Sequence, residues 1–368
     1  MQKSTYLLLA LCLACQPRTQ QVVTTPELGL DQLKQKLDSL YQAEINPAEP
    51  GAALLVAYNG EMVLSNGYGL RDVASQLPIT PSTNMRLASV SKQFTALCIL
   101  TLADQGLLNL SDQASDYLPH PIFEGITIEQ LANHTSGLPD YYEHFIENWD
   151  REKILENQDV LNWLATGPER AFEPGAQWEY SNTAYLMLAL IVEKVSGQEF
   201  SAFAREHVFQ KAGMERTTYY NLAKPADIPE RAYCYEIDDQ GQIDKVDGFF
   251  MNGVMGDGAV YTSINDYFQY DQALRKQSIL STAMHERMFQ SSSSHEVEGV
   301  ERHYAMGWGV TDSTASHSGG WLGTNTYTKR YFDIPLTYTI FMNRNTLFSS
   351  GLMQKTDSLV TMFYKRTK

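Results

Sequence analysis

The chain has 368 residues, of which 43% are hydrophobic and 19% are charged, and its formal net charge is −15. This hydrophobic fraction is typical of a globular protein with a substantial core, and the length fits one large domain or two modest ones. The acidic balance argues against a nucleic-acid partner, because nucleic-acid-binding proteins usually present a basic face.

The first residues have the pattern of an export signal. Lys3 precedes a short apolar run over residues 6–13, which ends at Ala14-Cys15 and is followed by polar residues. The run is shorter than the roughly 20 apolar residues that span a bilayer. It resembles a bacterial lipoprotein signal, in which Cys15 is lipidated and becomes the first residue of the mature protein.

Cys12 departs from that pattern, because such signals usually carry leucine there. Plain secretion and a retained signal therefore stay open as alternatives. We expect a signal over residues 1–15, a tether over 16–26 and a catalytic domain over 27–368. The protein would be exported to the bacterial cell envelope or periplasm and held at the membrane by its lipid.

The hydrophobic pattern predicts the following elements in chain order. They are a helix over residues 28–41, a hairpin of strands 52–58 and 61–65 about Asn59-Gly60, a helix over 89–107, a helical and loop-rich region over 108–180, a helix over 182–197, a turn and helix over 259–274, an exposed loop over 291–294, strands over 304–311, 324–332 and 336–343, and a helix over 347–364. Strands from both ends of the chain must meet to share a sheet. The predicted fold is an α/β (α+β) domain, in which helices flank one antiparallel sheet and a helical insertion forms a second subdomain.

Ser89 and Lys92 form the only Ser-x-x-Lys sequence in the chain. If a helix starts at Ser89, Lys92 lies one turn later on the same face, and its amine can reach the serine hydroxyl. A lysine that burial keeps neutral can take the serine proton. The alternative is that Ser89 only caps the helix.

Two further segments supply possible partners. Tyr180 and Asn182 precede a helix, where a phenol can carry a proton and an amide can bind substrate. Tyr219-Tyr220-Asn221 has the same spacing but no comparable surroundings.

His317, Gly319 and Gly320 open a strand-rich segment, and glycines let a substrate backbone approach a strand edge. The amides of Ser89 and Gly320 would form an oxyanion hole. Lys211-Ala212-Gly213 is a similar sequence, but its glycine reads better as the end of a helix.

Taken in order, Ser89-x-x-Lys92, Tyr180-x-Asn182 and His317-x-Gly319 resemble the motifs of serine β-lactamases and penicillin-binding proteins. Tyrosine in the second motif is similar to the class C β-lactamase and D-alanyl-D-alanine carboxypeptidase branch. Further similar segments surround the motifs, at residues 86–96, 131–139, 172–188 and 213–217, and the resemblance covers about residues 27–345.

The resemblance implies that Ser89 is acylated, that Lys92 is the base or co-base, that Tyr180 relays the proton and that Asn182 holds a substrate amide. His317 stands where many β-lactamases have lysine, and a mostly neutral histidine attracts a carboxylate less strongly. Efficient β-lactamase activity is therefore in doubt. Asn343 would contribute to the site for a substrate carboxylate, or would only be a turn residue at the end of a strand.

The other candidate residues point to structural roles. His134 lies in a predicted turn, and no histidine spacing indicates a metal. Cys98 and Cys234 would either pair or stay apart, and the apolar surroundings of Cys98 favour a buried free thiol. No cofactor is expected.

Three functions remain open on the sequence alone. The first is a peptidase acting on D-amino-acid peptides such as those of the cell wall. The second is a carboxylesterase or β-lactamase of the same mechanism. The third is a penicillin-binding-type protein that binds without catalysis, against which the complete Ser89, Lys92 and Tyr180 set weighs. The expected partners are a small-molecule or peptide substrate (cell-wall peptide, ester or β-lactam) and a membrane.

Overall fold

The computed structural model describes residues 28–297 and 300–368. The predicted signal over residues 1–15, with Cys15, and the tether over 16–26 lie outside these ranges. Within them, no helix combines the length and the apolar character that a membrane crossing requires.

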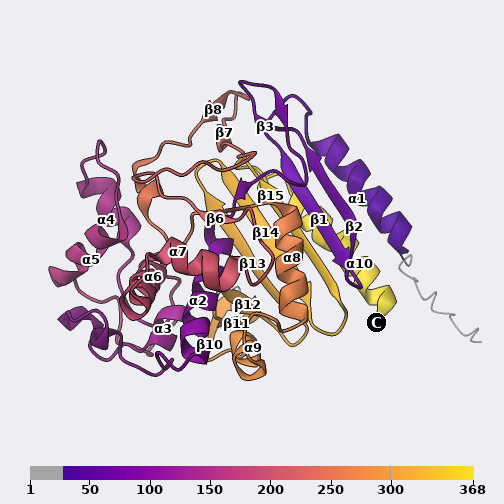
Figure 1. Cartoon of the computed structure of the whole chain (residues 1–368). Helices are drawn as coiled ribbons and strands as arrows, with labels where there is room; N and C mark the ends of the chain where they lie inside the picture. Colours follow the sequence, from indigo (N-terminus) through magenta and orange to yellow (C-terminus); the bar gives the residue numbers. More distant parts are fainter. Residues whose placement is uncertain (1–27, 298–299) are drawn as a thin grey trace, which may run out of the picture.

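An eight-stranded antiparallel sheet forms the centre of the molecule, in the order β10-β11-β12-β13-β14-β15-β1-β2 (Figure 1). Its strands are β1 (Ala52–Tyr58), β2 (Glu61–Tyr68), β10 (Ser293–Val297), β11 (Val300–Ala305), β12 (Trp308–Val310), β13 (Thr314–Trp321), β14 (Thr324–Tyr331) and β15 (Leu336–Met342). Strand β1 pairs with β15, so that Leu54 lies opposite Ile340. The predicted sheet built from both ends of the chain is confirmed.

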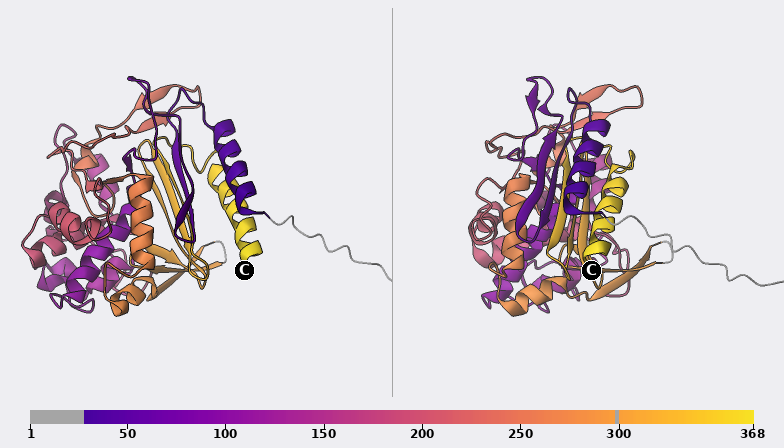
Figure 2. Two further views of the ribbon diagram at one scale, coloured as in Figure 1. Left: turned by 45° about the vertical axis from the view of Figure 1, so that its right-hand side comes forward. Right: turned by 90° about the vertical axis from the view of Figure 1, so that its right-hand side faces the viewer.

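The two faces of the sheet bury separate cores. In β1, Ala53, Leu55 and Ala57 face the core on the side of the helical insertion. The residues between them face a second core under α1 (Leu30–Glu44) and α10 (Leu352–Thr367). Side chains of a strand alternate between faces, so an apolar run such as β1 is suited to a sheet covered on both sides. Figure 2 shows α1 and α10 together on one face and α8 on the other.

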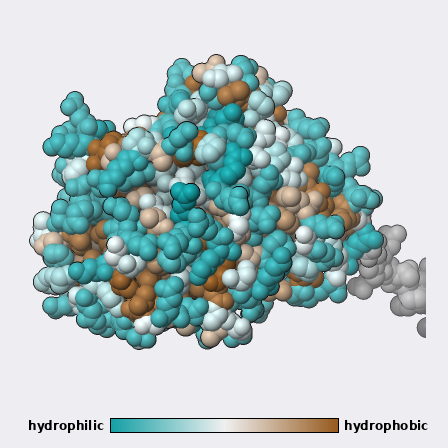
Figure 3. Space-filling view, in the orientation of Figure 1, coloured by the Kyte–Doolittle hydropathy of each residue, from teal (hydrophilic) through white to brown (hydrophobic). Residues whose placement is uncertain are grey.

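The remaining elements form the helical subdomain and its connections to the sheet. The helices are α2 (Lys92–Asp104), α3 (Ile128–Ala132), α4 (Tyr141–Asn148), α5 (Asn157–Ala165), α6 (Asn182–Ser196), α7 (Phe200–Ala204), α8 (Ile264–Arg275) and α9 (Thr282–Phe289). The short strands are β3 (Leu70–Asp72), β4 (Leu77–Pro78), β5 (Met85–Arg86), β6 (Thr218–Tyr219), β7 (Tyr235–Ile237), β8 (Ile243–Lys245) and β9 (Val260–Thr262). On the face seen in Figure 3, hydrophilic residues predominate and hydrophobic ones form separate patches.

Local turn chemistry accounts for several predicted boundaries. Asn59 and Gly60 have φ angles of 52° and 80°, as the two-residue hairpin turn requires. Helix α6 ends before Gly197, whose φ is 70°. The Ser181 hydroxyl caps the start of α6 by accepting a hydrogen bond from the amide of Ala184.

Several predicted elements differ from the structure in their bounds or in their continuity. The helix over 89–107 starts as the 3-10 helix η1 (Ala88–Ser91) and ends at Asp104. The strand over 304–311 is two strands, because Met306 and Gly307 turn the chain with φ angles of 43° and 83°. Part of the serine-rich segment 291–294 pairs in β10, and the last helix starts only after Gly351.

Candidate active site

Ser89 lies in a strained turn that is fixed to a neighbouring strand. The preceding residue, Ala88, has a φ of 47°, which is costly for a residue with a side chain. The amide of Leu87 donates to the carbonyl of Val260 at 2.8 Å, and the amide of Val260 donates to Ser91 Oγ at 3.1 Å. These bonds hold the turn, and with it Ser89, against β9.

Lys92 is completely buried, and its amine joins three parts of the site. Nζ donates to Asn182 Oδ1 at 2.9 Å, to the carbonyl of Asp257 at 2.9 Å and to Ser89 Oγ at 3.4 Å. Three acceptors match the three N–H groups of an ammonium. The structure thus brings together the Ser89 and Lys92 side chains that the sequence spacing predicted.

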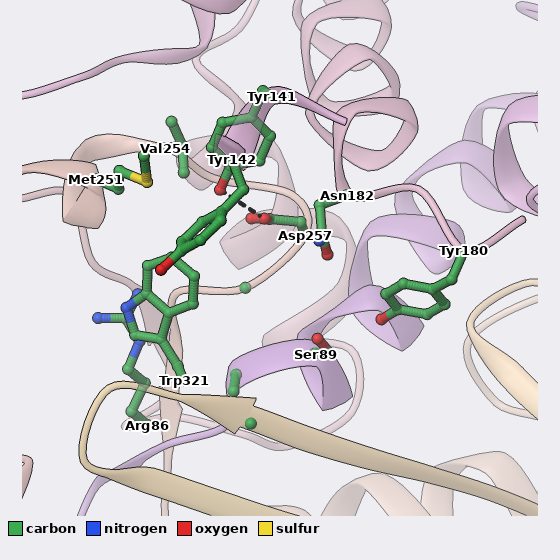
Figure 4. A pocket seen from close by; sticks show the side chains of 13 residues that line it. Arg86, Ser89, Tyr141, Tyr142, Tyr180, Asn182, Met251, Val254, Asp257 and Trp321 are labelled. Carbon is green, nitrogen blue, oxygen red and sulfur yellow. Dashed lines mark hydrogen bonds between the residues drawn. The ribbon is translucent and has the colours of Figure 1, made fainter. Parts of the chain in front are cut away.

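Tyr180 packs its ring beside this amine, with Lys92 Nζ 4.8 Å from the ring centroid. Its hydroxyl is buried without a hydrogen-bond partner, and in Figure 4 it points towards Ser89. An unpartnered hydroxyl in this position is free to accept or donate a proton during a reaction.

The His134 ring packs against the ring of Tyr180. The two ring centroids are 4.3 Å apart, and His134 Nδ1 accepts a hydrogen bond from the amide of Ser181. Burial holds the pKa of His134 well below its usual value, so the ring stays neutral. We assign His134 to the support of the Tyr180 segment.

Asn182 is fixed from two sides. Its Oδ1 accepts from Lys92, while its backbone amide and Nδ2 donate to Asp140 Oδ2 at 3.0 and 3.2 Å. A primary amide has two N–H groups, so one remains for a ligand. A contact between Asn182 and a substrate amide stays a prediction.

One cavity of about 320 Å³ contains Ser89, Tyr180, Asn182 and Gly320 in its lining (Figure 4). All four were candidate site residues on the sequence alone, and they come from three separate segments of the chain. The fold therefore brings these four residues, from segments that are distant in the sequence, to the wall of one cavity.

Strand β13 approaches the turn that contains Ser89 so closely that position 319 has room only for glycine. A Cβ there would lie 2.3 Å from Thr326 Oγ1 and 2.4 Å from the carbonyl oxygen of Leu87. The Thr326 hydroxyl donates to that carbonyl at 2.7 Å. Gly319 therefore fixes the distance between strand and turn, while Gly320 lines the cavity.

The edge of β13 that faces the site is largely unpaired within the described residues. Strand β12 pairs with β13 only at Ala315 and Ser316, although β14 pairs with β13 along its whole length. A free strand edge can take up an extended substrate backbone.

His317 is a neutral ring, as the sequence analysis expected, but it does not line the cavity of Ser89. Its Nδ1 donates to the carbonyl of Ser318 at 2.6 Å, so Nε2 of the neutral ring accepts from the Tyr304 hydroxyl at 3.0 Å. Burial, together with the positive charge of Lys92, lowers the pKa of His317 to about 3. The ring lines a second hollow beside Tyr180 and not the cavity of Ser89.

The expectation for Asn343 is corrected by its contacts. Its Oδ1 accepts from the amide of Gly51 at 2.8 Å, and Nδ2 donates to the carbonyls of Leu70 and Tyr233, both at 3.0 Å. The side chain is buried and ties three chain segments together, so its amide is not offered to a substrate.

The sequence analysis assigned no role to Arg86, Tyr141 and Asp257, which also line the cavity. The Tyr141 hydroxyl donates to Asp257 Oδ2 at 3.0 Å, and burial raises the pKa of the Asp257 carboxyl. The sequence contains only weak signals for these residues. Arg86 lies in a segment similar to the family, and Asp257 lies between two glycines, but neither residue is part of a motif with a characteristic spacing.

Among residues 28–297 and 300–368, no group of His, Cys, Asp and Glu side chains has the arrangement of a metal site. Cys98 and Cys234 are both buried and free. The expected free thiol at Cys98 is confirmed.

Comparisons with known proteins identify the family of the chain. The family model described as Beta-lactamase matches residues 35–357. Penicillin-binding protein 4* of Bacillus subtilis is 33% identical over 344 residues, which cover 89% of this chain and 76% of that protein. The putative penicillin-binding protein PbpX of the same organism is 30% identical over 75% of this chain and 66% of its own length.

Two solved structures show the same fold. The penicillin-binding protein homologue from Pyrococcus abyssi superposes with a TM-score of 0.74 at 22% identity, over 89% of this chain and 78% of that one. The D-amino acid amidase from Ochrobactrum anthropi gives a TM-score of 0.75 at 20% identity, over 92% and 98% of the two chains. The chain belongs to the β-lactamase family, which includes the penicillin-binding proteins.

Proposed function

We propose that the protein is a serine hydrolase that forms an acyl-enzyme on Ser89. The observation that supports this best is the buried Lys92 amine, 3.4 Å from Ser89 Oγ and beside the unpartnered Tyr180 hydroxyl. A nucleophile next to a group that can move its proton, at the wall of a cavity, is the arrangement that covalent catalysis needs.

In this proposal, Ser89 Oγ attacks the substrate carbonyl and its proton passes to the Lys92 and Tyr180 pair. The amides of Ser89 and Gly320 stabilise the negative oxygen that forms. Tyr180 then donates a proton to the departing group, which leaves an ester on Ser89. Water hydrolyses the ester with the same groups acting in reverse.

Amides and peptides of D-amino acids are the proposed substrates. The fold similarity to the D-amino acid amidase from Ochrobactrum anthropi and the penicillin-binding-protein names of the Bacillus subtilis relatives support this choice. The second candidate is a carboxylesterase, with β-lactamase action as its variant. The neutral His317 favours the ester, because the end of the site beside Tyr180 then has no histidine cation for a peptide carboxylate.

A panel of substrates separates these functions. D-amino acid amides, D-Ala-D-Ala peptides, p-nitrophenyl esters and a penicillin are each offered to the wild type and to Ser89→Ala. We expect turnover that Ser89→Ala abolishes, and the better substrate class distinguishes amidase from esterase. Full turnover by Ser89→Ala would refute the proposed site.

We also propose that the protein is exported and lipid-anchored through Cys15, on the basis of the apolar run that ends at Ala14-Cys15. Cys15→Ala should release the protein from the membrane fraction or leave its signal uncleaved. An unchanged mass and unchanged fractionation of the variant would contradict the anchor.

A further inference from the structure

Arg86 is a buried cation in the lining of the Ser89 cavity, with an exposed fraction of 6%. Its Nη1 donates to Asn252 Oδ1 at 2.8 Å, and its Nε has no partner. In the part of the chain that the structure describes, no carboxylate lies within 4.0 Å of the guanidinium, whereas Arg231 and Arg275 each have one. A buried charge without a counter-charge is costly, so its place in a cavity calls for an explanation.

The surrounding residues hold this guanidinium in one position. Asn252 Nδ2 donates to the carbonyl of Asp247 at 2.9 Å, so Asn252 Oδ1 is turned towards Arg86. The same oxygen accepts from Trp321 Nε1 at 2.9 Å, and the indole centroid lies 5.7 Å from the guanidinium carbon. The cation is thus positioned before any ligand arrives, which lowers the entropic cost of binding.

One acidic residue shares the cavity lining with Arg86. This residue is Asp257, but burial raises the pKa of its carboxyl and so disfavours its negative form. The negative charge of Asp257 therefore does not fully offset the positive charge of Arg86 in the cavity lining.

The position of Arg86 indicates which part of the substrate it meets. Figure 4 shows Arg86 and Tyr180 at opposite ends of the cavity, with Ser89 between them. Tyr180 is the group that serves the leaving group in the proposed function. The acyl part of the substrate then extends the other way, towards Arg86 and Trp321.

We propose that Arg86 binds a carboxylate at the far end of the acyl part, so that the preferred substrates are esters or amides of acyl groups that end in a carboxylate. This inference rests on the proposed acyl-enzyme at Ser89. A guanidinium suits a carboxylate because it can donate two parallel N–H bonds. The net charge of −15 repels anions at long range, so such a preference must come from a local contact.

The test compares three p-nitrophenyl esters of equal chain length, whose acyl groups end in a carboxylate, a methyl group or an ammonium. For the wild type, we expect kcat/KM for the carboxylate ester to exceed that for the methyl-ended ester by about 10- to 100-fold, the range for a hydrogen bond to a charged group. The ammonium-ended ester should be the poorest of the three.

Arg86→Gln removes the charge and should abolish the preference for the carboxylate ester, mainly through KM. Asn252→Asp is the second variant, because it keeps the guanidinium but supplies a competing carboxylate at the same oxygen position. It should also lose the preference. Arg151→Gln removes an exposed arginine outside the cavity lining and should retain it.

The outcomes separate this inference from the proposed function. Equal kcat/KM for the carboxylate and methyl esters in the wild type, or a preference for the ammonium ester, would overturn the role of Arg86 while leaving the acyl-enzyme intact. Retention of the preference in both Arg86→Gln and Asn252→Asp would also overturn it. Turnover by Ser89→Ala would instead remove the proposed function itself. Labelling of each variant by a neutral fluorophosphonate verifies that the site is folded.

Discussion

The two ends of the candidate active site each bury an ionisable side chain, but one is neutral and the other is charged. At the Tyr180 end, His317 is buried as a neutral ring, and both of its nitrogens are hydrogen-bonded within the protein. At the other end, Arg86 is buried as a cation that uses one nitrogen and leaves Nε without a partner. A satisfied neutral group supports the architecture, whereas an unsatisfied charged one is suited to bind something.

This difference shows that the motif position alone does not locate the charge of the site. Position 317, where many members of the family have lysine, was expected to help bind the substrate through a mostly neutral histidine. The structure has its cation in the cavity lining at position 86, three residues before the nucleophile. Substrate preference should follow the location of the charge and not the motif.

The largest effect is expected from replacing Lys92, whose amine lies between the two ends of the site. Lys92→Met keeps most of the bulk but removes the hydrogen bonds to Ser89, Asn182 and the Asp257 carbonyl. Acylation should slow by at least about 100-fold, the usual loss for a missing general base. Pre-steady-state labelling with a fluorophosphonate measures the rate.

The matched control is Lys153→Met, because the Lys153 side chain is 72% exposed and pairs only with Asp150. It should label at the rate of the wild type. Lys92→Met labelling within a fewfold of the wild type would show that another group takes the Ser89 proton.

A smaller effect is expected at the neutral end of the site, in the pH dependence of the free energy of unfolding. Unfolded histidine takes up a proton near pH 6.5, whereas folded His317 does so only near pH 3. The unfolded state binds more protons between these values, so the free energy of unfolding should fall as the pH drops from 7 to 5. In His317→Gln this fall should be smaller by about 1 to 2 kcal/mol.

Urea unfolding at pH 7 and pH 5 measures the difference, and the remaining histidines contribute equally to both proteins. Identical falls in stability for the wild type and His317→Gln would mean that the pKa of His317 is not lowered in the folded protein. The contrast between the two ends of the site would then disappear.

The elements and the proximity of Ser89 to Lys92 were predictable from the sequence because they depend on local rules. The Asn59-Gly60 turn, the glycine that ends α6 and the one-turn spacing of Ser89 and Lys92 are such features. The role of Asn343 was not accessible, because its partners Gly51, Leu70 and Tyr233 come from distant segments. Arg86 was missed for the same reason: its significance lies in its cavity position and in the lack of a carboxylate within 4.0 Å among the described residues, which only the folded chain reveals.

The most direct measurement of the central claim is the mass of the intact protein after reaction with a fluorophosphonate, followed by peptide mapping. We predict one adduct per wild-type chain, on the peptide that contains Ser89, and no adduct on Ser89→Ala. An adduct that persists in Ser89→Ala, or that maps to a peptide without Ser89, would contradict the assignment of the nucleophile.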